Sequence, residues 1–145
     1  MTIVRFFVPG APVGKGRPIA GMKFVKGGGR LPSLRTPEKT VAYEGLVAHA
    51  GHVAMAGRPL LTGPVSMVVR IDCQMPKSFS KAKRAAALAG TVRPTTKPDS
   101  SNVLKGLEDG LNGVVWVDDV QAVEHVVSKR YAETPGVTVE IEELT

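Results

Sequence analysis

Acidic residues with fixed spacing occur in residues 97–121, and side chains of this kind could act on phosphates. Asp99 stands directly after Pro98, and Asp118 and Asp119 are neighbours between two apolar segments. Two adjacent carboxylates repel one another unless a cation offsets their charge, and carboxylate oxygens are preferred ligands of Mg²⁺. The alternative is a polar hairpin turn whose aspartates face water. The spacing alone does not separate these two interpretations.

A helix is expected to follow Asp99 and to end near Gly113. Asp99, Ser100 or Ser101 can cap its amino end. At about 100° per residue, its apolar side chains share one face that can pack on a core: Val103, Leu104, Leu107 and Leu111. Polar side chains share the opposite face: Ser101, Asn102, Lys105, Asp109 and Asn112. The helix therefore has one packing side and one side that presents amides, a lysine and a carboxylate.

The charge of the chain is divided between a basic part and an acidic part. The net charge is +6, but residues 1–98 hold sixteen Lys or Arg against three acids, and residues 99–145 hold three against ten. The first part can neutralise phosphates, whereas the second can approach nucleic acid only when metal ions offset its charge. A simple role in solubility is the alternative. Nucleic-acid binding is favoured over it, because residues 1–37 carry seven basic residues and no acid.

Two segments rich in glycine, proline and basic residues predict loops that can approach a ligand. Residues 9–18 cannot sustain a helix, and they place Lys15 and Arg17 where phosphates could come close. The full spacing of a P-loop is absent from this segment. Residues 26–30 have the same character, and they are expected to form a hairpin tip or a loop that becomes ordered on a ligand.

Apolar patterning predicts the remaining elements. Strands are expected over five segments: residues 2–8, 64–74, 114–117, 120–129 and 136–142. The last of these alternates cleanly and is expected to pair antiparallel with residues 120–131. One helix should begin at Thr36-Pro37-Glu38, with Thr36 as its cap and Pro37 in its first position, and run to about Met55. A short basic helix, capped by Ser80, should extend from Ser80 to Leu88.

Composition and length exclude several classes of protein. The 145 residues suit one domain, and no apolar run reaches the length of about 18 residues that a membrane span requires. The apolar N-terminus stops at Pro9 and is expected to be a strand rather than a signal peptide. A single cysteine, Cys73, excludes an internal disulfide, fits a reducing cytoplasm and is expected to be buried. His49 and His52 lack a nearby carboxylate or cysteine, which argues against a metal pair.

The spacing in residues 97–121 resembles that of the RusA family of Holliday-junction resolvases, many of which phages and prophages carry. The likeness rests on fixed offsets within one block: Lys97-Pro98-Asp99-x-x-Asn102-x-x-Lys105-x-x-x-Asp109-x-Leu111-Asn112-Gly113-Val114-x-x-x-Asp118-Asp119-x-Gln121. An early basic loop, a helix and a strand agree with it, so the resemblance covers most of the chain and is strongest over residues 97–129. It implies a homodimer that cuts four-way DNA junctions with Mg²⁺, or with Mn²⁺, in recombination and repair. It implies no small-molecule cofactor and no membrane partner.

The resemblance also implies roles for individual residues. Asp99, Lys105 and Asp119 are the expected catalytic residues, and Asp118 joins Asp99 and Asp119 as an expected metal ligand. Mg²⁺ would activate a water molecule and stabilise the charge that develops on the scissile phosphate. Lys105 would add a fixed positive charge near that phosphate or orient the water. The expected DNA-binding residues are Lys15, Arg17, Lys97, Asn102 and Lys129.

The family pattern is broken at one position. Family members usually have Asp-x-Asp-Asn, whereas this chain has Asp99-Ser100-Ser101-Asn102. A hydroxyl is a poorer Mg²⁺ ligand than a carboxylate and removes one negative charge. Asp109 or Asp118 could compensate, the site could hold a second metal weakly, or the protein could bind junctions without cutting them. Three carboxylates remain, so a nuclease is expected. The alternatives are an attenuated or inactive branched-DNA-binding protein and a structural protein with a solvated acidic turn.

We therefore expect one α/β (α+β) domain over residues 1–145, with a mixed or antiparallel sheet packed against helices 37–56 and 100–112. The second helix and the Asp118-Asp119 turn should meet at one end of the sheet. The basic loops 15–35 and the segment 77–97 should flank this acidic cluster and hold phosphate backbones. Dimerisation follows from the family resemblance and from the two-fold symmetry of a junction.

Overall fold

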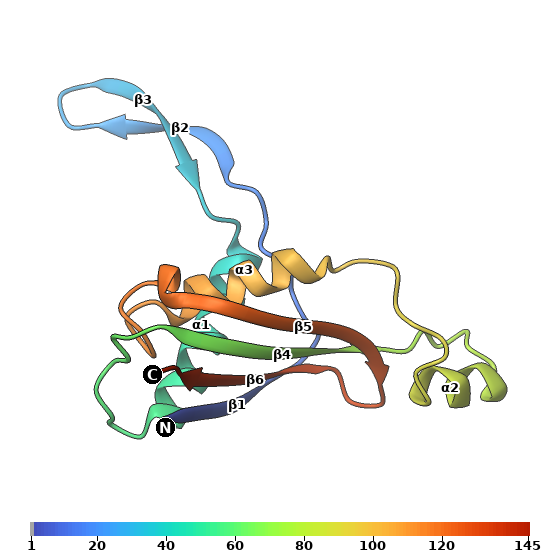
Figure 1. The fold of residues 1–145 in the computed structure, drawn as a ribbon. Helices are drawn as coiled ribbons and strands as arrows, with labels where there is room; N and C mark the ends of the chain where they lie inside the picture. Colours follow the sequence, from blue (N-terminus) through green and yellow to red (C-terminus); the bar gives the residue numbers. More distant parts are fainter. Residues whose placement is uncertain (1) are drawn as a thin grey trace.

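The computed structural model describes residues 2–145 and has a mixed four-stranded sheet packed against two helices (Figure 1). The elements described in that range are β1 (Ile3–Pro9), β2 (Ile19–Val25), β3 (Gly29–Arg35), α1 (Glu38–Met55), β4 (Val65–Gln74), α2 (Lys81–Leu88), α3 (Ser100–Leu111), the 3₁₀ turn η1 (Asp119–Gln121), β5 (Ala122–Ala132) and β6 (Gly136–Glu143). The α+β fold class expected from the sequence is confirmed. No helix within residues 2–145 is long and apolar enough to cross a membrane.

The strands of the main sheet lie in the order β1-β6-β4-β5. β6 is antiparallel to β1 and β4, whereas β4 and β5 are parallel. The expected pairing of residues 136–142 with residues 120–131 is therefore wrong, since β4 lies between these strands. The burial of the side chains gives the reason. β6 has a fully buried apolar face, which suits a central strand, whereas Val123 and Val126 of β5 are exposed, which suits an edge.

The core lies between one face of this sheet and helices α1 and α3. Strand side chains that are fully buried there include Val4, Val8, Met67, Val69, Ile71, Val137, Val139 and Ile141. Val103, Leu107 and Leu111 of α3 are fully buried against them, and Leu104 packs at the margin. The apolar face expected for this helix is confirmed, so its polar face points away from the core.

Two glycines bring α1 and α3 into direct contact. A Cβ atom placed on Gly51 of α1 would lie 2.7 Å from Cδ2 of Leu111, which is closer than atoms approach in proteins. A Cβ atom on Gly110 of α3 would lie 3.1 Å from the carbonyl oxygen of Glu44 and from Cβ of Val47. The absence of side chains at these two positions lets the helices pack closely and fixes where α3 lies on the sheet.

Residues 114–117 do not form the expected strand. The chain bends back on the end of α3, with the amides of Val114 and Val115 both donating to the carbonyl of Leu111. Val115 and Trp116 are both fully buried, and the pairing of residues 114–117 is limited to isolated bridges of Trp116 with Leu61 and Asn112. The indole Nε1 of Trp116 donates to Oδ1 of Asn112 at 2.8 Å and holds this turn against the helix.

The ends of the other elements agree with the sequence in part. Helix α1 begins at Glu38, one residue later than expected, with Pro37 in the cap position. No side chain caps its amino end, so the cap expected from Thr36 is not formed. Ser80 does cap α2, since its hydroxyl accepts a hydrogen bond from the amide of Lys83 at 3.1 Å.

Strands β2 and β3 form a hairpin that projects away from the sheet (Figure 1). Its tip lies at residues 26–28, and Cys73 is buried, both as expected.

Candidate active site

Asp99 caps the amino end of α3. Its Oδ1 accepts hydrogen bonds from the backbone amides of Ser101 at 2.8 Å and Asn102 at 3.4 Å. The carboxylate is exposed and lies at the positive end of the helix, where a negative charge is favoured. Ser101 is exposed beside it, and its amide rather than its hydroxyl contacts Asp99. Of the three candidate caps, Asp99, Ser100 and Ser101, the structure shows Asp99 in this role.

Lys105 links α3 to the acidic turn that follows the helix. Its Nζ lies 3.3 Å from Oδ2 of Asp119 and 3.2 Å from Oδ1 of Asp109. Hydrogen bonding to Asp109 and then to Asp119 raises the pKa of Lys105, while its limited burial opposes this. The side chain of Asp118 and the Lys105 ammonium lower the pKa of Asp119. Lys105 and Asp119 are therefore both charged at neutral pH, and the helix and the turn meet as expected.

Gln121 holds the backbone of the acidic turn in place. Its Oε1 accepts hydrogen bonds from the amides of Val117 and Asp118, both at 3.0 Å. Its Nε2 donates to the carbonyls of Leu61 at 2.9 Å and Gly63 at 3.0 Å. Gln121 thus ties the turn to the chain that leads into β4. The sequence contained its signal, because Gln121 closes the block of fixed offsets, but no role was assigned to it.

Lys15 lies against the polar face of α3 rather than in an open loop. Its ammonium binds the carboxylates of Asp109 and Glu44, the latter at 3.3 Å. Its backbone amide donates to the carbonyl of Asn102 at 3.0 Å. Asp109 is the main cause of the raised pKa of Lys15. Two carboxylates therefore already neutralise Lys15, whose expected DNA contact stays a prediction. Glu44, in α1, was not anticipated, since no motif connects it to Lys15.

Glu108 and His125 form a second pair beside Asp119. Nε2 of His125 lies 3.6 Å from Oε2 of Glu108. Burial raises the pKa of Glu108, the nearby charge of Asp119 raises it further, and His125 opposes both effects. No sequence motif indicates this pair, because α3 and β5 bring the two residues together only in the folded chain.

Three of the remaining residues expected to bind DNA lie around the amino end of α3: Lys97, Asn102 and Lys129. Lys97 and Asn102 line a hollow of about 600 Å³ that also includes Asp99 and Lys15. Nζ of Lys129 donates to the carbonyl of Pro98 at 2.9 Å and so supports the loop before α3. Arg17 is exposed at the base of the β2–β3 hairpin. Their contacts with DNA stay predictions.

The three expected metal ligands are not gathered into one cluster. Asp118 and Asp119 contact each other, but none of the contacts within residues 2–145 joins Asp99 to them. In the same range, no group of three or more His, Cys, Asp or Glu side chains is arranged to hold a metal ion. Mg²⁺, however, keeps several waters and binds through one or two carboxylates plus substrate phosphates. The Asp118-Asp119 pair fits a metal ion of this kind, and the full ligand set stays a prediction.

Comparisons with known proteins show which family model and which relative the chain matches. A family model described as endodeoxyribonuclease RusA matches residues 9–142, which include every element from β2 to β5. The chain is also similar to an uncharacterized protein, YqaN, of Bacillus subtilis (strain 168). The two are 42% identical over 149 residues, and this stretch covers 100% of this chain and 99% of YqaN.

Proposed function

The chain belongs to the RusA family of endodeoxyribonucleases, and we propose that it is a Mg²⁺-dependent nuclease that cuts branched DNA at four-way junctions. The observation that carries this proposal is the contact of 3.3 Å between Nζ of Lys105 and Oδ2 of Asp119, which lie fourteen residues apart in the chain. It places a fixed positive charge beside a carboxylate in an exposed position, where the pair can stabilise charge on a phosphate and help to hold a metal ion.

The acidic turn is the proposed metal site. Asp118 and Asp119 would hold Mg²⁺ or Mn²⁺ together with a DNA phosphate, and Asp99 is proposed as a further ligand. The bound metal would activate a water molecule and offset the charge that develops on the phosphate. Lys105 would keep its ammonium near that phosphate, because the neighbouring carboxylates hold it protonated. Catalysis by Asp99, Lys105 and Asp119 is proposed on this basis.

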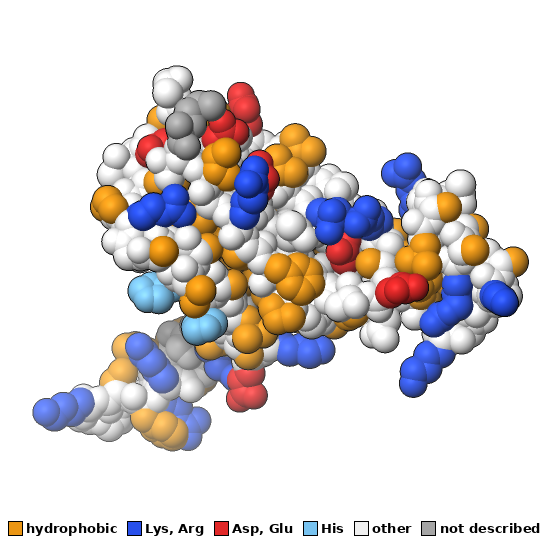
Figure 2. Space-filling view, turned by 90° about the horizontal axis from the view of Figure 1, so that it is seen from below, with side chains coloured by type: hydrophobic (Ala, Val, Ile, Leu, Met, Phe, Trp, Pro, Cys, Tyr) orange, Lys and Arg blue, Asp and Glu red, His pale blue; other side chains and the backbone are white. Residues whose placement is uncertain are grey.

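The β2–β3 hairpin is proposed to hold the DNA backbone. Lys23, Lys26, Arg30 and Arg35 lie on it or at its tip, and residues 1–37 contain no acid to oppose them. Figure 2 shows Lys, Arg and hydrophobic side chains together on this projecting arm. Phe24 is 80% exposed, with the guanidinium of Arg30 5.0 Å from the centre of its ring. Exposed positive charges such as these can neutralise phosphates and release counterions from DNA.

A homodimer is proposed because a four-way junction has two-fold symmetry and two opposed strands must be cut. The family resemblance supports this assembly. The same resemblance supports a place in DNA recombination and repair and a phage or prophage origin.

A second candidate is a branched-DNA-binding protein that cuts weakly or not at all. Ser101 favours this candidate, because its neutral hydroxyl stands where the family usually has a carboxylate. The hydroxyl is exposed beside Asp99, so it removes one charge from the amino end of α3.

Cleavage of a synthetic four-way junction, with each strand labelled in turn, tests these candidates. The natural protein should cut two opposed strands in Mg²⁺, and Asp119→Asn should bind the junction without cutting it. Ser101→Asp should raise the rate, and Glu142→Gln, on strand β6, which β4 separates from β5, serves as the charge control. Tight binding with no cutting by either the natural protein or Ser101→Asp would reject the nuclease and support the binding protein.

A further inference from the structure

The basic helix α2 lies at the opposite end of β5 from the acidic turn. Asp119 belongs to η1, which leads directly into the first residue of β5, whereas α2 borders a hollow of about 530 Å³ lined by the last residue of β5, Ala132, and by Glu133. The expectation that segment 77–97 flanks the acidic cluster is wrong for α2. The strand separates them along its whole length (Figure 1).

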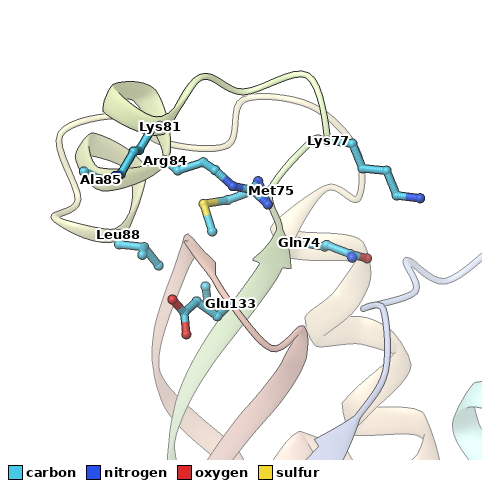
Figure 3. A pocket seen from close by; sticks show the side chains of 9 residues that line it. Gln74, Met75, Lys77, Lys81, Arg84, Ala85, Leu88 and Glu133 are labelled. Carbon is cyan, nitrogen blue, oxygen red and sulfur yellow. The ribbon is translucent and has the colours of Figure 1, made fainter.

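The hollow beside α2 has the charge of an anion site. Lys77, Lys81 and Arg84 line it, and Glu133 is the single acid among its lining residues (Figure 3). Met75 also lines it. Residues 73–98, which include α2, contain six Lys or Arg and no acid. A group with negative charge, such as a backbone phosphate, would therefore be attracted to this hollow.

Aromatic contacts fix α2 relative to β5. The ring of Phe79, just before the helix, packs edge-on against the ring of Tyr131 in β5, with centroids 5.4 Å apart. Nζ of Lys83 lies 4.5 Å from the centre of the Phe79 ring. Ser80 caps the first turn. Because the helix is anchored to the strand in this way, its basic side chains stay at a set distance from the acidic turn.

The length of β5 sets that distance. The strand has 11 residues, and at about 3.3 Å per residue it spans about 35 Å. One helical turn of B-DNA is also about 34–36 Å. A duplex that lies along this edge, with one phosphate at Asp119, would therefore present phosphates of the same face again at α2.

We propose that the hollow beside α2 binds backbone phosphates of a duplex arm about one helical turn from the phosphate that is cut. This inference rests on the proposed function, since it takes the acidic turn as the place of cutting. It gives the protein a means of sensing that a double-stranded arm of sufficient length extends from the branch point. Such phosphate contacts would position the duplex without reading its sequence.

The test measures Kd for four-way junctions whose arms range from about 6 to 16 base pairs, spanning one helical turn. For the natural protein, Kd should fall about tenfold as the arms become long enough to reach α2, at about 10–12 base pairs. In the double variant Lys81→Gln/Arg84→Gln, the ratio of short-arm to long-arm Kd should approach one. Arg93→Gln, which removes a charge from the same basic segment but not from the hollow, should keep the tenfold ratio.

Three results would overturn the inference. The first is a natural protein whose Kd does not depend on arm length, and the second is a double variant that keeps the tenfold ratio. The third applies if circular dichroism shows that the double variant is misfolded: the two single variants then keep the tenfold ratio. The first result would leave the hollow to an acidic protein partner. If the step in Kd is present and lost in the variant but no strand is cut, phosphate binding by the hollow stands and the proposed nuclease activity fails, so the two can be distinguished.

Discussion

Lys105 and Asp119 lie in contact, with 3.3 Å between Nζ and Oδ2, and this ion pair joins the polar face of α3 to the acidic turn. The same ammonium lies 3.2 Å from Asp109. Lys105 therefore stabilises two carboxylates that would otherwise repel each other. In the proposed reaction this lysine and a bound metal ion compete for Asp119, since both are cations.

This competition leads to a prediction for Lys105→Met. The variant should bind Mg²⁺ at the acidic turn more tightly, because Asp119 no longer has the ammonium as its partner. Its single-turnover cleavage rate should nevertheless fall by about 100-fold, since a fixed positive charge near the phosphate is lost. Mg²⁺ titration followed by calorimetry and cleavage at saturating metal would separate the two effects. A rate restored by excess Mg²⁺ would show that Lys105 acts only on metal binding.

Gln121→Ala should disturb the turn itself. The substitution removes the acceptor for two backbone amides and the donor for the carbonyls of Leu61 and Gly63. We expect the free energy of unfolding to fall by about 2 kcal/mol, as for loss of a partly buried hydrogen-bond network. Cleavage should fall as well, because Asp118 and Asp119 are no longer held in place. Urea unfolding measures the first effect, with exposed Gln74→Ala as the control, and unchanged stability would contradict the proposed role.

Glu108 provides a prediction about pH. Burial is the main cause of the raised pKa of Glu108 in the folded protein. At a pH above this raised pKa the carboxyl group is ionised, and its ionisation lowers the stability of the fold; as the pH falls, protonation removes this loss of stability. Glu108→Gln should therefore raise Tm at neutral and alkaline pH, by no more than about 3 °C. The gain should shrink as the pH falls through the raised pKa. Thermal unfolding at several pH values would check this, and a gain that grows in acid would contradict it.

The sequence was sufficient for the local part of the site. A cap among Asp99, Ser100 and Ser101, the apolar face of α3 and the meeting of the helix with the Asp118-Asp119 turn were expected from helical periodicity and from spacing within a short block. These features depend on residues that are close in the chain. For the same reason Ser80 could be identified as the cap of α2.

The pairing of strands could not be obtained in this way. Alternation in β6 shows which residues face the core, but it does not show which strands lie on either side. The insertion of β4 between β5 and β6 depends on contacts between distant parts of the chain. The ion pairs of Lys15 with Asp109 and Glu44 likewise require a loop and two helices to come together. Patterns within a single segment contain no information about such contacts.

The structure predicts different effects of Arg17 and Lys15 on the salt dependence of DNA binding. Arg17 is exposed near the hairpin, so Arg17→Ala should remove one phosphate contact and reduce the slope of log Kd against log salt by about 0.9. Lys15→Ala should change this slope less, because Asp109 and Glu44 already neutralise its ammonium. It should instead lower Tm, since the partly buried Glu44 loses its cationic partner and Asp109 keeps only Lys105. Binding measured from low to physiological salt, together with thermal unfolding, would test both variants. Equal changes in slope would show that Lys15 leaves its carboxylates to bind DNA.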